Sequence, residues 1–394
     1  MTHKELLLNN KIVRQLSIIQ FTAYFGAWFS NVAIYSMLVE FNASAFLISL
    51  VVAMNFIPSI ILTPFSGSLV DSLPTKKFMI ILLILELIMT LGFLTINSLN
   101  DIWFLLILLF IKMGSASIFF TTEMALLPKL LDGDLLTKAN EIHSIIWSFT
   151  FTAGMALGGI VVYHFGTTSA FLIDISFFII ALIILLNTFF DIEEKTKQIT
   201  NIILDIKDGL TYLIKNKKII YYILLHSSVG LTAFDALITL LADYQYKHII
   251  AVSLSIGLTN AIRAFALMIG PFFITNWINH KRLFYIIIIQ GISIIIWGIL
   301  QNNFYFALIG IFLTGFVTTT LWSFTYAMIQ ESTQNQYLGR VLSYNEMIFM
   351  GVNMLTTFSI GILANYISLQ YITFLIGVLF IIVALLYKVI IWDR

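Results

Sequence analysis

Several ionisable side chains lie inside long apolar stretches of this chain, and five of them are candidates for a role in function. Glu86 and Asp235 are near the middle of their stretches, Lys112 and Arg263 lie at comparable depth, and Glu123 is near one end. A charge at the centre of a bilayer costs at least about 2.5–3.5 kcal/mol. Because an acid and a base at similar depth can neutralise each other, we expect two ion pairs, Glu86 with Lys112 and Asp235 with Arg263.

A buried acid beside a cation can serve in two ways, and the sequence leaves both open. It can form a static pair that fixes helix register, or it can exchange its proton as a cavity opens to alternate sides. Moving one charge through a membrane potential releases about 2.3 kcal/mol per 100 mV, so one titrating acid can harness that drive. The expected proton carriers, in order, are Asp235, Glu86 and Glu123.

Polar and aromatic residues recur at three- or four-residue steps in the first, fourth, seventh and tenth apolar stretches. That spacing places them on one face of a helix. Such stripes can simply hold helices together, but four of them on every third helix favour a shared central cavity. Its aromatic lining suits a bulky, partly apolar substrate, lipophilic cations included. The residues expected to line it are Gln20, Tyr24, Trp28, Asn31, Tyr35, Phe119, Thr232, Trp322 and Tyr326.

Membrane-spanning helices must position these side chains. The chain has 394 residues, of which 60% are hydrophobic and 10% charged, whereas soluble domains carry about 25% charged residues. Twelve apolar stretches match the roughly 20 residues that a helix needs to cross about 30 Å of hydrocarbon. The sequence therefore predicts an all-α membrane protein. The predicted spans are 13–40, 44–70, 77–97, 102–128, 138–163, 168–190, 219–246, 251–277, 283–301, 303–329, 340–366 and 369–391.

Lys and Arg are distributed unevenly around these spans. Of 21 such residues, Lys112 and Arg263 lie deep inside spans, and Lys247 lies in the loop after the seventh span. All the others lie in the termini, in the loops that follow even-numbered spans, or in the span ends next to them. An excess of Lys and Arg marks the cytoplasmic side of a membrane. The sequence therefore predicts a multi-pass protein of the bacterial inner (plasma) membrane with both termini in the cytoplasm.

Residues 191–218 are too polar to span a membrane. Their isoleucines and leucines recur at helical spacing, which predicts an amphipathic helix along the cytoplasmic surface. This linker divides the chain into a six-helix half at 1–190 and a second at 219–394. Two halves joined by a charged loop are typical of secondary transporters.

The loop after the second span resembles the signature loop of the major facilitator superfamily. The matching residues are Gly67, Asp71, Lys76 and Lys77. Ser72 and Thr75 stand where the family pattern is basic, which weakens the charge lock of that loop. The resemblance implies a two-halved transporter fold in which this loop takes part in the conformational change.

Three further stretches resemble the drug–proton antiporter branch, which includes macrolide efflux and siderophore (enterobactin-type) exporters. They are Ala125–Pro128 with Lys138–Asn140, Gln330–Val341, and the glycines Gly154, Gly158 and Gly159 in the fifth span. Met155 replaces the proline of the antiporter motif. Glycines at these positions allow close packing of the fifth span against the other half.

The resemblance and the buried charges together predict a proton-coupled exporter of drug-like or macrolide-like amphipathic molecules that works by alternating access. Two alternatives stay open. The chain could export or flip an acidic metabolite, such as a siderophore or lysolipid, bound by Lys112 and Arg263. It could instead be a non-transporting receptor or scaffold on a transporter fold.

Other classes of function lack their residues. The sequence holds no cysteine, Walker loop, metal-ligand cluster or nucleophile triad, and its net charge is +1. We therefore expect neither an enzyme nor a nucleic-acid binder. We expect no metal and no cofactor, with a proton gradient as energy source. The expected partners are a small-molecule substrate and membrane lipids, and the expected state is a monomer.

Overall fold

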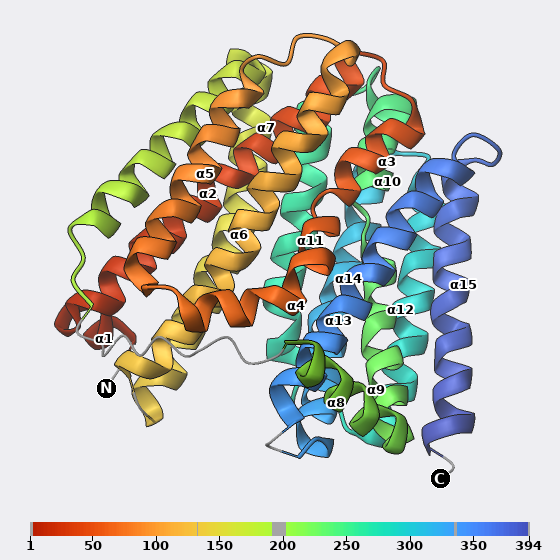
Figure 1. Cartoon of the computed structure of the whole chain (residues 1–394). Helices are drawn as coiled ribbons and strands as arrows, with labels where there is room; N and C mark the ends of the chain where they lie inside the picture. Colours follow the sequence, from red (N-terminus) through yellow and green to blue (C-terminus); the bar gives the residue numbers. More distant parts are fainter. Residues whose placement is uncertain (1–2, 132, 191–201, 335–336, 393–394) are drawn as a thin grey trace.

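The computed structural model describes residues 3–131, 133–190, 202–334 and 337–392, and in these ranges the chain is helical with short connections. The helices stand side by side, and both chain ends lie at the bottom of Figure 1. We call that end the terminal face and the opposite end the far face. The first half of the chain forms α1 (His3–Asn9), α2 (Lys11–Glu40), α3 (Ala45–Ala53), α4 (Ile57–Ser72), α5 (Thr75–Phe93), α6 (Ile102–Leu130) and α7 (Gly133–Leu186).

The second part of the chain begins with α8, which lies within the predicted linker 191–218. Its helices are α8 (Ile202–Lys215), α9 (Lys217–Ser227), α10 (Asp235–Leu241), α11 (Val252–Ile274), α12 (His280–Leu300), α13 (Phe304–Ser332), α14 (Leu338–Leu363) and α15 (Leu369–Tyr387). A 3-10 turn (Ser228–Thr232) precedes α10, and π-helical turns follow α10 (Ala242–Tyr246) and α15 (Lys388–Trp392).

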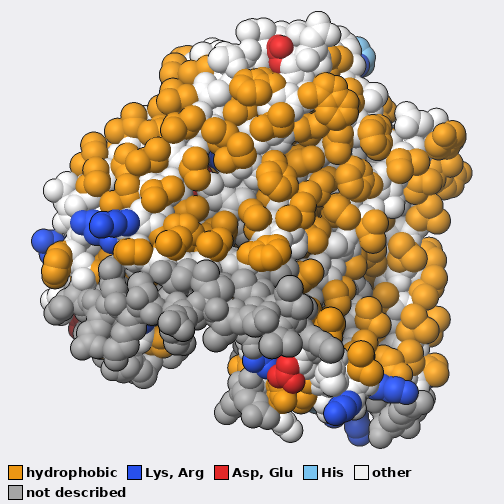
Figure 2. Space-filling view, in the orientation of Figure 1, with side chains coloured by type: hydrophobic (Ala, Val, Ile, Leu, Met, Phe, Trp, Pro, Cys, Tyr) orange, Lys and Arg blue, Asp and Glu red, His pale blue; other side chains and the backbone are white. Residues whose placement is uncertain are grey.

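Nine helices of the described residues are long and apolar enough to cross a membrane. One of them, Lys138–Leu186, is 49 residues long and bends at Gly166, where φ is 79°. Glycine adopts that positive φ without steric cost, and the non-helical backbone at Gly166 separates two helices, at the predicted fifth and sixth spans. Figure 2 shows hydrophobic side chains over most of one face, with most of the visible Lys and Arg near the terminal face. The chain is therefore a multi-pass membrane protein.

The second predicted span is interrupted. Helix α3 ends at Ala53, and α4 starts at Ile57 with Pro58 in its first turn. Proline has no backbone N–H, and its ring clashes with the carbonyl four residues earlier in a continuous helix. The break therefore follows from Pro58, and it leaves Asn55 in the turn between the two helices.

The linker helix α8 packs on the terminal face of the second half. Asp208 pairs with Arg340 at 2.5 Å, and the Tyr212 ring stacks on Tyr337 with centroids 4.1 Å apart. Leu213 of α8 is buried. Helix α8 is thus anchored to the residues around the start of α14. The part of the predicted linker at 191–201 lies outside the described residues.

Two glycine contacts join the halves of the chain near the far face. A Cβ added to Gly159 of α7 would lie 2.7 Å from the Ser253 carbonyl oxygen at the start of α11. A Cβ on Gly361 of α14 would lie 2.4 Å from Ser49 Oγ of α3. Because neither position has room for a larger residue, the backbones touch there and close the far face. These contacts place α10 and α11 against helices of the first half.

Candidate functional site

The seventh predicted span is broken, which the sequence analysis did not foresee. Helix α9 gives way to the 3-10 turn, and Ala233 (φ −71°, ψ 72°) then makes a tight turn in which Phe234 N–H donates to the Thr232 carbonyl at 2.8 Å. This is an inverse γ-turn. The Ser228 and Thr232 hydroxyls donate to carbonyls three residues earlier. Such bonds compete with regular helix bonds, and α10 restarts at Asp235.

Arg263 of α11 lies against this break. Its Nη2 donates to the Thr232 carbonyl at 2.9 Å, and its Nη1 is 3.7 Å from Asp235 Oδ1. The guanidinium also lies 5.4 Å from the centre of the Phe234 ring. The predicted pairing of Asp235 with Arg263 is therefore present, and Arg263 also binds backbone that the helix leaves free. The Asp235 and Arg263 side chains are 23% and 12% exposed, respectively.

The first half of the chain supplies the groups that face this pair. Asn55, in the turn after α3, donates to the Tyr35 hydroxyl of α2 at 2.9 Å. Tyr35 is buried and lies within electrostatic range of Asp235 and Arg263. Helices α2 and α3 both contact α10, and α2 also contacts α11. The broken seventh span and the broken second span thus meet at the junction of the two halves.

The second ion pair lies wholly within the first half and corrects a prediction. Lys112 Nζ of α6 donates to Asp174 Oδ2 of α7 at 2.6 Å, and Ser30 of α2 donates to the same oxygen at 2.5 Å. The predicted pairing of Lys112 with Glu86 is wrong. Glu86 is buried nearby, within electrostatic range of both charges, but α7 brings the nearer carboxylate to the lysine.

Asp174 was missed by the sequence analysis, although its signal was present. It is an acid in the middle of the apolar stretch 168–190, and the rule that intramembrane acids need partners applies to it as to Glu86. Lys112 and Asp174 are 5% and 0% exposed. The ammonium also lies 5.2 Å from the Phe93 ring centre and 5.1 Å from that of Phe178. The pair is therefore fully enclosed.

Two striped residues of the first half contact His143 of α7, and a third packs one helical turn or more away. Gln20 donates to the His143 carbonyl at 3.1 Å, and the Tyr24 ring is 6.1 Å from the His143 ring. Trp28 stacks on Phe151 at 4.4 Å. Phe119 is 3% exposed and belongs to the apolar core of the first half, so its place in the cavity stays a prediction. The neighbouring residue, Phe120, contacts His143 at 5.3 Å.

In the second half, Trp322 and Tyr326 of α13 are half-buried and stack on each other with ring centroids 5.0 Å apart. Both rings border His226 of α9. Each half thus places aromatic rings around one histidine. Of the other expected lining residues, Asn31 is half-buried, and Thr232 lies in the broken span with its carbonyl bound to Arg263.

The remaining predicted residues have more local surroundings. Lys76 donates to the Leu186 carbonyl, 2.9 Å away at the C-terminal end of α7. The helix dipole stabilises a cation at that end. Lys77 is exposed. Gly67 and Asp71 lie on α4, and the surroundings of both residues lie outside what the structure describes. Glu123 is buried, and its Oε2 has no hydrogen-bond partner among the described residues.

The glycine motif of α7 contacts both halves of the chain. Gly154 and Gly158 pack against Trp28 and Phe29 of α2. Gly159 packs against α11, where a Cβ would also meet the Gly257 Cα at 3.2 Å. The α7 glycines therefore join α2, α7 and α11 beside the broken span.

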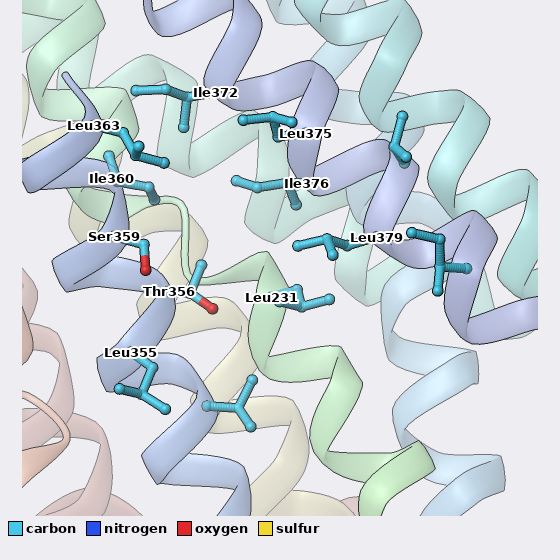
Figure 3. A pocket seen from close by; sticks show the side chains of 13 residues that line it. Leu231, Leu355, Thr356, Ser359, Ile360, Leu363, Ile372, Leu375, Ile376 and Leu379 are labelled. Atoms are coloured by element: carbon cyan, nitrogen blue, oxygen red, sulfur yellow. The ribbon is translucent and has the colours of Figure 1, made fainter. Parts of the chain in front are cut away.

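A cavity of about 510 Å³ lies between α14, α15 and Leu231. Figure 3 shows its lining of aliphatic side chains from both helices, with Thr356 and Ser359 on α14. Leu355 and Leu375 in this lining are largely exposed. The cavity has apolar walls and no charged lining residue, so we place the charge chemistry at the broken span and not here.

Comparisons with known proteins agree with this architecture. The family model described as Major Facilitator Superfamily matches residues 16–296 and 247–394. Macrolide efflux protein A of Streptococcus pyogenes is 24% identical over 322 residues, covering 79% of each chain. The protein of the same name in Enterococcus faecalis is 24% identical over 299 residues, 74% of this chain and 92% of that one.

Among solved structures, a D-xylose–proton symporter superposes with a TM-score of 0.74 at 12% identity, over 95% of this chain and 96% of that one. At that identity the likeness shows the fold alone. The family model, in contrast, covers nearly the whole sequence. The chain therefore belongs to the major facilitator superfamily.

Proposed function

We propose that this transporter exports amphipathic small molecules across the bacterial inner membrane in exchange for protons, with the proton gradient as its energy source. The terminal face lies in the cytoplasm, and twelve spans form two six-helix halves, 1–190 and 219–394, around the linker 191–218. One observation carries the proposal. The Asp235–Arg263 pair lies at a broken helix, partly exposed, where the halves of the chain meet.

This position suits a proton carrier that responds to alternating access. When the halves separate at the far face, Tyr35 and Asn55 move away from Asp235, and its carboxylate gains solvent. Asp235 then has different surroundings in the two states, and this difference is what couples its protonation to the conformational equilibrium. Arg263 can keep its bond to the Thr232 carbonyl while Asp235 is protonated. The break therefore stays formed through the cycle.

Three observations support an amphipathic substrate. Aromatic rings of both halves border the predicted cavity stripes, with Tyr24 and Trp28 in the first half and Trp322 and Tyr326 in the second. Two relatives carry the name macrolide efflux protein. Finally, both intramembrane cations are bound to internal partners, Lys112 to Asp174 and Arg263 to Asp235. The cations are thus occupied, which weakens the alternative of an acidic metabolite.

The test uses purified protein in liposomes and a radiolabelled macrolide. With an imposed pH gradient, we expect the wild type to accumulate the macrolide and Asp235→Asn to lose that accumulation. The variant should still exchange labelled for unlabelled macrolide without a gradient, which shows that it folds and binds. Glu331→Gln is the control, because Glu331 is an exposed acid at the end of α13 and has no place in the proposed mechanism. Gradient-driven accumulation by Asp235→Asn at the wild-type level would remove Asp235 from the coupling role.

A further inference from the structure

The second half of the chain encloses one histidine in a cage of rings. His226 of α9 is fully buried. Its ring centroid lies 5.4 Å from those of Trp322 and Tyr326 on α13, and 5.4 Å from that of Phe349 on α14. Three helices thus contribute to one cluster. We call these four residues the His226 cage.

The hydrogen bonds around His226 indicate which ring nitrogen carries the proton and which one lacks a hydrogen-bond partner. Nδ1 lies 2.9 Å from Thr325 Oγ1. The Thr325 hydroxyl proton is already directed at backbone carbonyls, 2.8 Å from Leu321 O and 3.1 Å from Trp322 O. Thr325 therefore accepts from His226, which puts the proton on Nδ1 and leaves Nε2 as an acceptor. Nε2 is buried and has no hydrogen-bond partner among the described residues.

An acid lies beside the cage. Glu346 is three residues before Phe349 on α14, so the two side chains share a helix face. It lies within electrostatic range of the Tyr326 hydroxyl. No Lys or Arg of the described residues pairs with it. The carboxylate thus has neither a counter-charge nor a fixed partner from the described chain.

These groups together favour a ligand of one chemical kind. A buried acceptor without a donor costs about 1–3 kcal/mol of desolvation, so Nε2 favours a ligand that donates a hydrogen bond. Aromatic rings attract a cation, and the Glu346 carboxylate supplies the opposite charge. A protonated amine meets all three requirements, because it carries both a positive charge and an N–H. A quaternary ammonium meets only the last two.

We propose that the His226 cage with Glu346 binds the protonated amine of the transported molecule. The proposal rests on the function proposed above and adds the chemical group that the second half recognises. The N–H of the amine donates to His226 Nε2, Glu346 balances the charge, and Trp322, Tyr326 and Phe349 surround the substituents on nitrogen. The apolar remainder of the molecule extends toward the aromatic residues of the first half.

The test measures binding to the full chain in lipid nanodiscs by equilibrium dialysis, with empty nanodiscs subtracting partition into lipid. The probes share one apolar group and differ in the head: naphthylmethyl-dimethylamine, naphthylmethyl-trimethylammonium and naphthylmethanol. We expect the dimethylamine to bind at least about tenfold more tightly than the alcohol, which is the size of one charge-assisted contact. Equal affinity of the wild type for amine and alcohol overturns the proposal.

Two variants assign the preference to residues. Glu346→Gln should remove most of the preference for the amine over the alcohol, whereas Glu331→Gln, an exposed acid at the end of α13, should keep it. His226→Phe keeps a ring and removes the acceptor, so it should bring the dimethylamine and the trimethylammonium to similar affinity. Alcohol binding reports that each variant is folded. A parallel loss for amine and alcohol in Glu346→Gln counts against the proposal.

The liposome experiment separates this proposal from the export function. Amine-selective binding without macrolide flux in wild-type liposomes supports the cage and contradicts export. Macrolide flux with no amine preference in nanodiscs supports export and overturns the cage.

Discussion

The two intramembrane ion pairs differ in the distance between their charges, in their exposure and in the regularity of the helices that carry them. Lys112 and Asp174 lie 2.6 Å apart between regular helices of one half, and their side chains are 5% and 0% exposed. Arg263 and Asp235 lie 3.7 Å apart at a broken helix facing the other half, and their side chains are 12% and 23% exposed. The same residue chemistry is thus enclosed in one place and accessible in the other.

The difference teaches that pairing alone does not indicate function. A fully enclosed pair repays its desolvation only with its partner and hydrogen bonds in place, so removing one member is strongly destabilising. A partly exposed pair at the junction of the halves depends less on full enclosure, so its rearrangement costs the fold less. We therefore expect the first pair to contribute to stability, whereas the second pair fits the coupling role proposed above.

The largest expected effect is on the enclosed pair. Asp174→Asn leaves Lys112 as an uncompensated buried charge and should lower the free energy of unfolding by about 3–5 kcal/mol. Lys112→Met should cost a similar amount, and the double variant should cost less than either, because it buries no charge. Denaturant unfolding in detergent measures all three. Additive losses in the double variant would show that the two side chains do not stabilise each other.

A smaller loss is expected at the broken span. Arg263→Met removes a charged hydrogen bond to the Thr232 carbonyl, a contact typically contributing about 1.5–3 kcal/mol. Arg263→Lys keeps the charge but lacks the two-armed geometry that reaches both Thr232 and Asp235, so it should restore only part of the stability. The same unfolding measurement applies. A loss in Arg263→Met equal to that in Asp174→Asn would erase the distinction between the pairs.

The sequence predicted some of this contrast and not the rest. Spacing and hydropathy located the buried charges, and Asp235 with Arg263 paired as expected. The Lys112 partner was misassigned because depth along a helix does not say which of several helices lies beside it, and α7 carries a closer acid than α5. The break before Asp235 was missed because it contains no proline. It depends on Ser and Thr hydroxyls and on a tertiary bond from Arg263, which a single-helix pattern does not reveal.

The same limits apply to the aromatic residues. Helical periodicity put Phe119 in the cavity stripe, but it did not identify Phe120, whose ring contacts His143. Trp322 and Tyr326 were identified by their spacing, since four-residue steps keep side chains on one helix face. Glu346 and Phe349 were missed because α14 carries no clear polar stripe, and their role depends on contact with α9 and α13.

If the Asp235–Arg263 pair lies at a junction that opens, the helices around it must move relative to one another. Gly159→Ala places a Cβ 2.7 Å from the Ser253 carbonyl, and overpacking of this kind costs about 1–3 kcal/mol. The closed far face should therefore become less populated. Gly339→Ala, where a Cβ meets nothing within 4 Å, is the control. Because the chain has no cysteine, spin labels at Tyr163→Cys and Ile249→Cys can report the distance, and an unchanged distribution in Gly159→Ala contradicts the prediction.

The smallest effect on the free energy of unfolding is expected at an exposed ion pair. Asp208 and Arg340 form a third pair on the terminal face, with side chains 54% and 35% exposed. Exposed pairs contribute about 0–1 kcal/mol and are screened by salt. Asp208→Asn should therefore change the free energy of unfolding by less than about 1 kcal/mol, and less still at high salt. A loss above that of Arg263→Met would mean that exposure does not order the three pairs.

Substrate-driven proton movement tests the coupling role of Asp235 most directly. Liposomes holding a trapped pH dye are given an outward macrolide gradient, and proton flux is recorded for the wild type, Asp235→Asn and protein-free vesicles. We predict macrolide-dependent proton flux in the wild type and none above the protein-free level in Asp235→Asn, although the variant still exchanges macrolide. Wild-type proton flux in Asp235→Asn would contradict the assignment of coupling to the broken span.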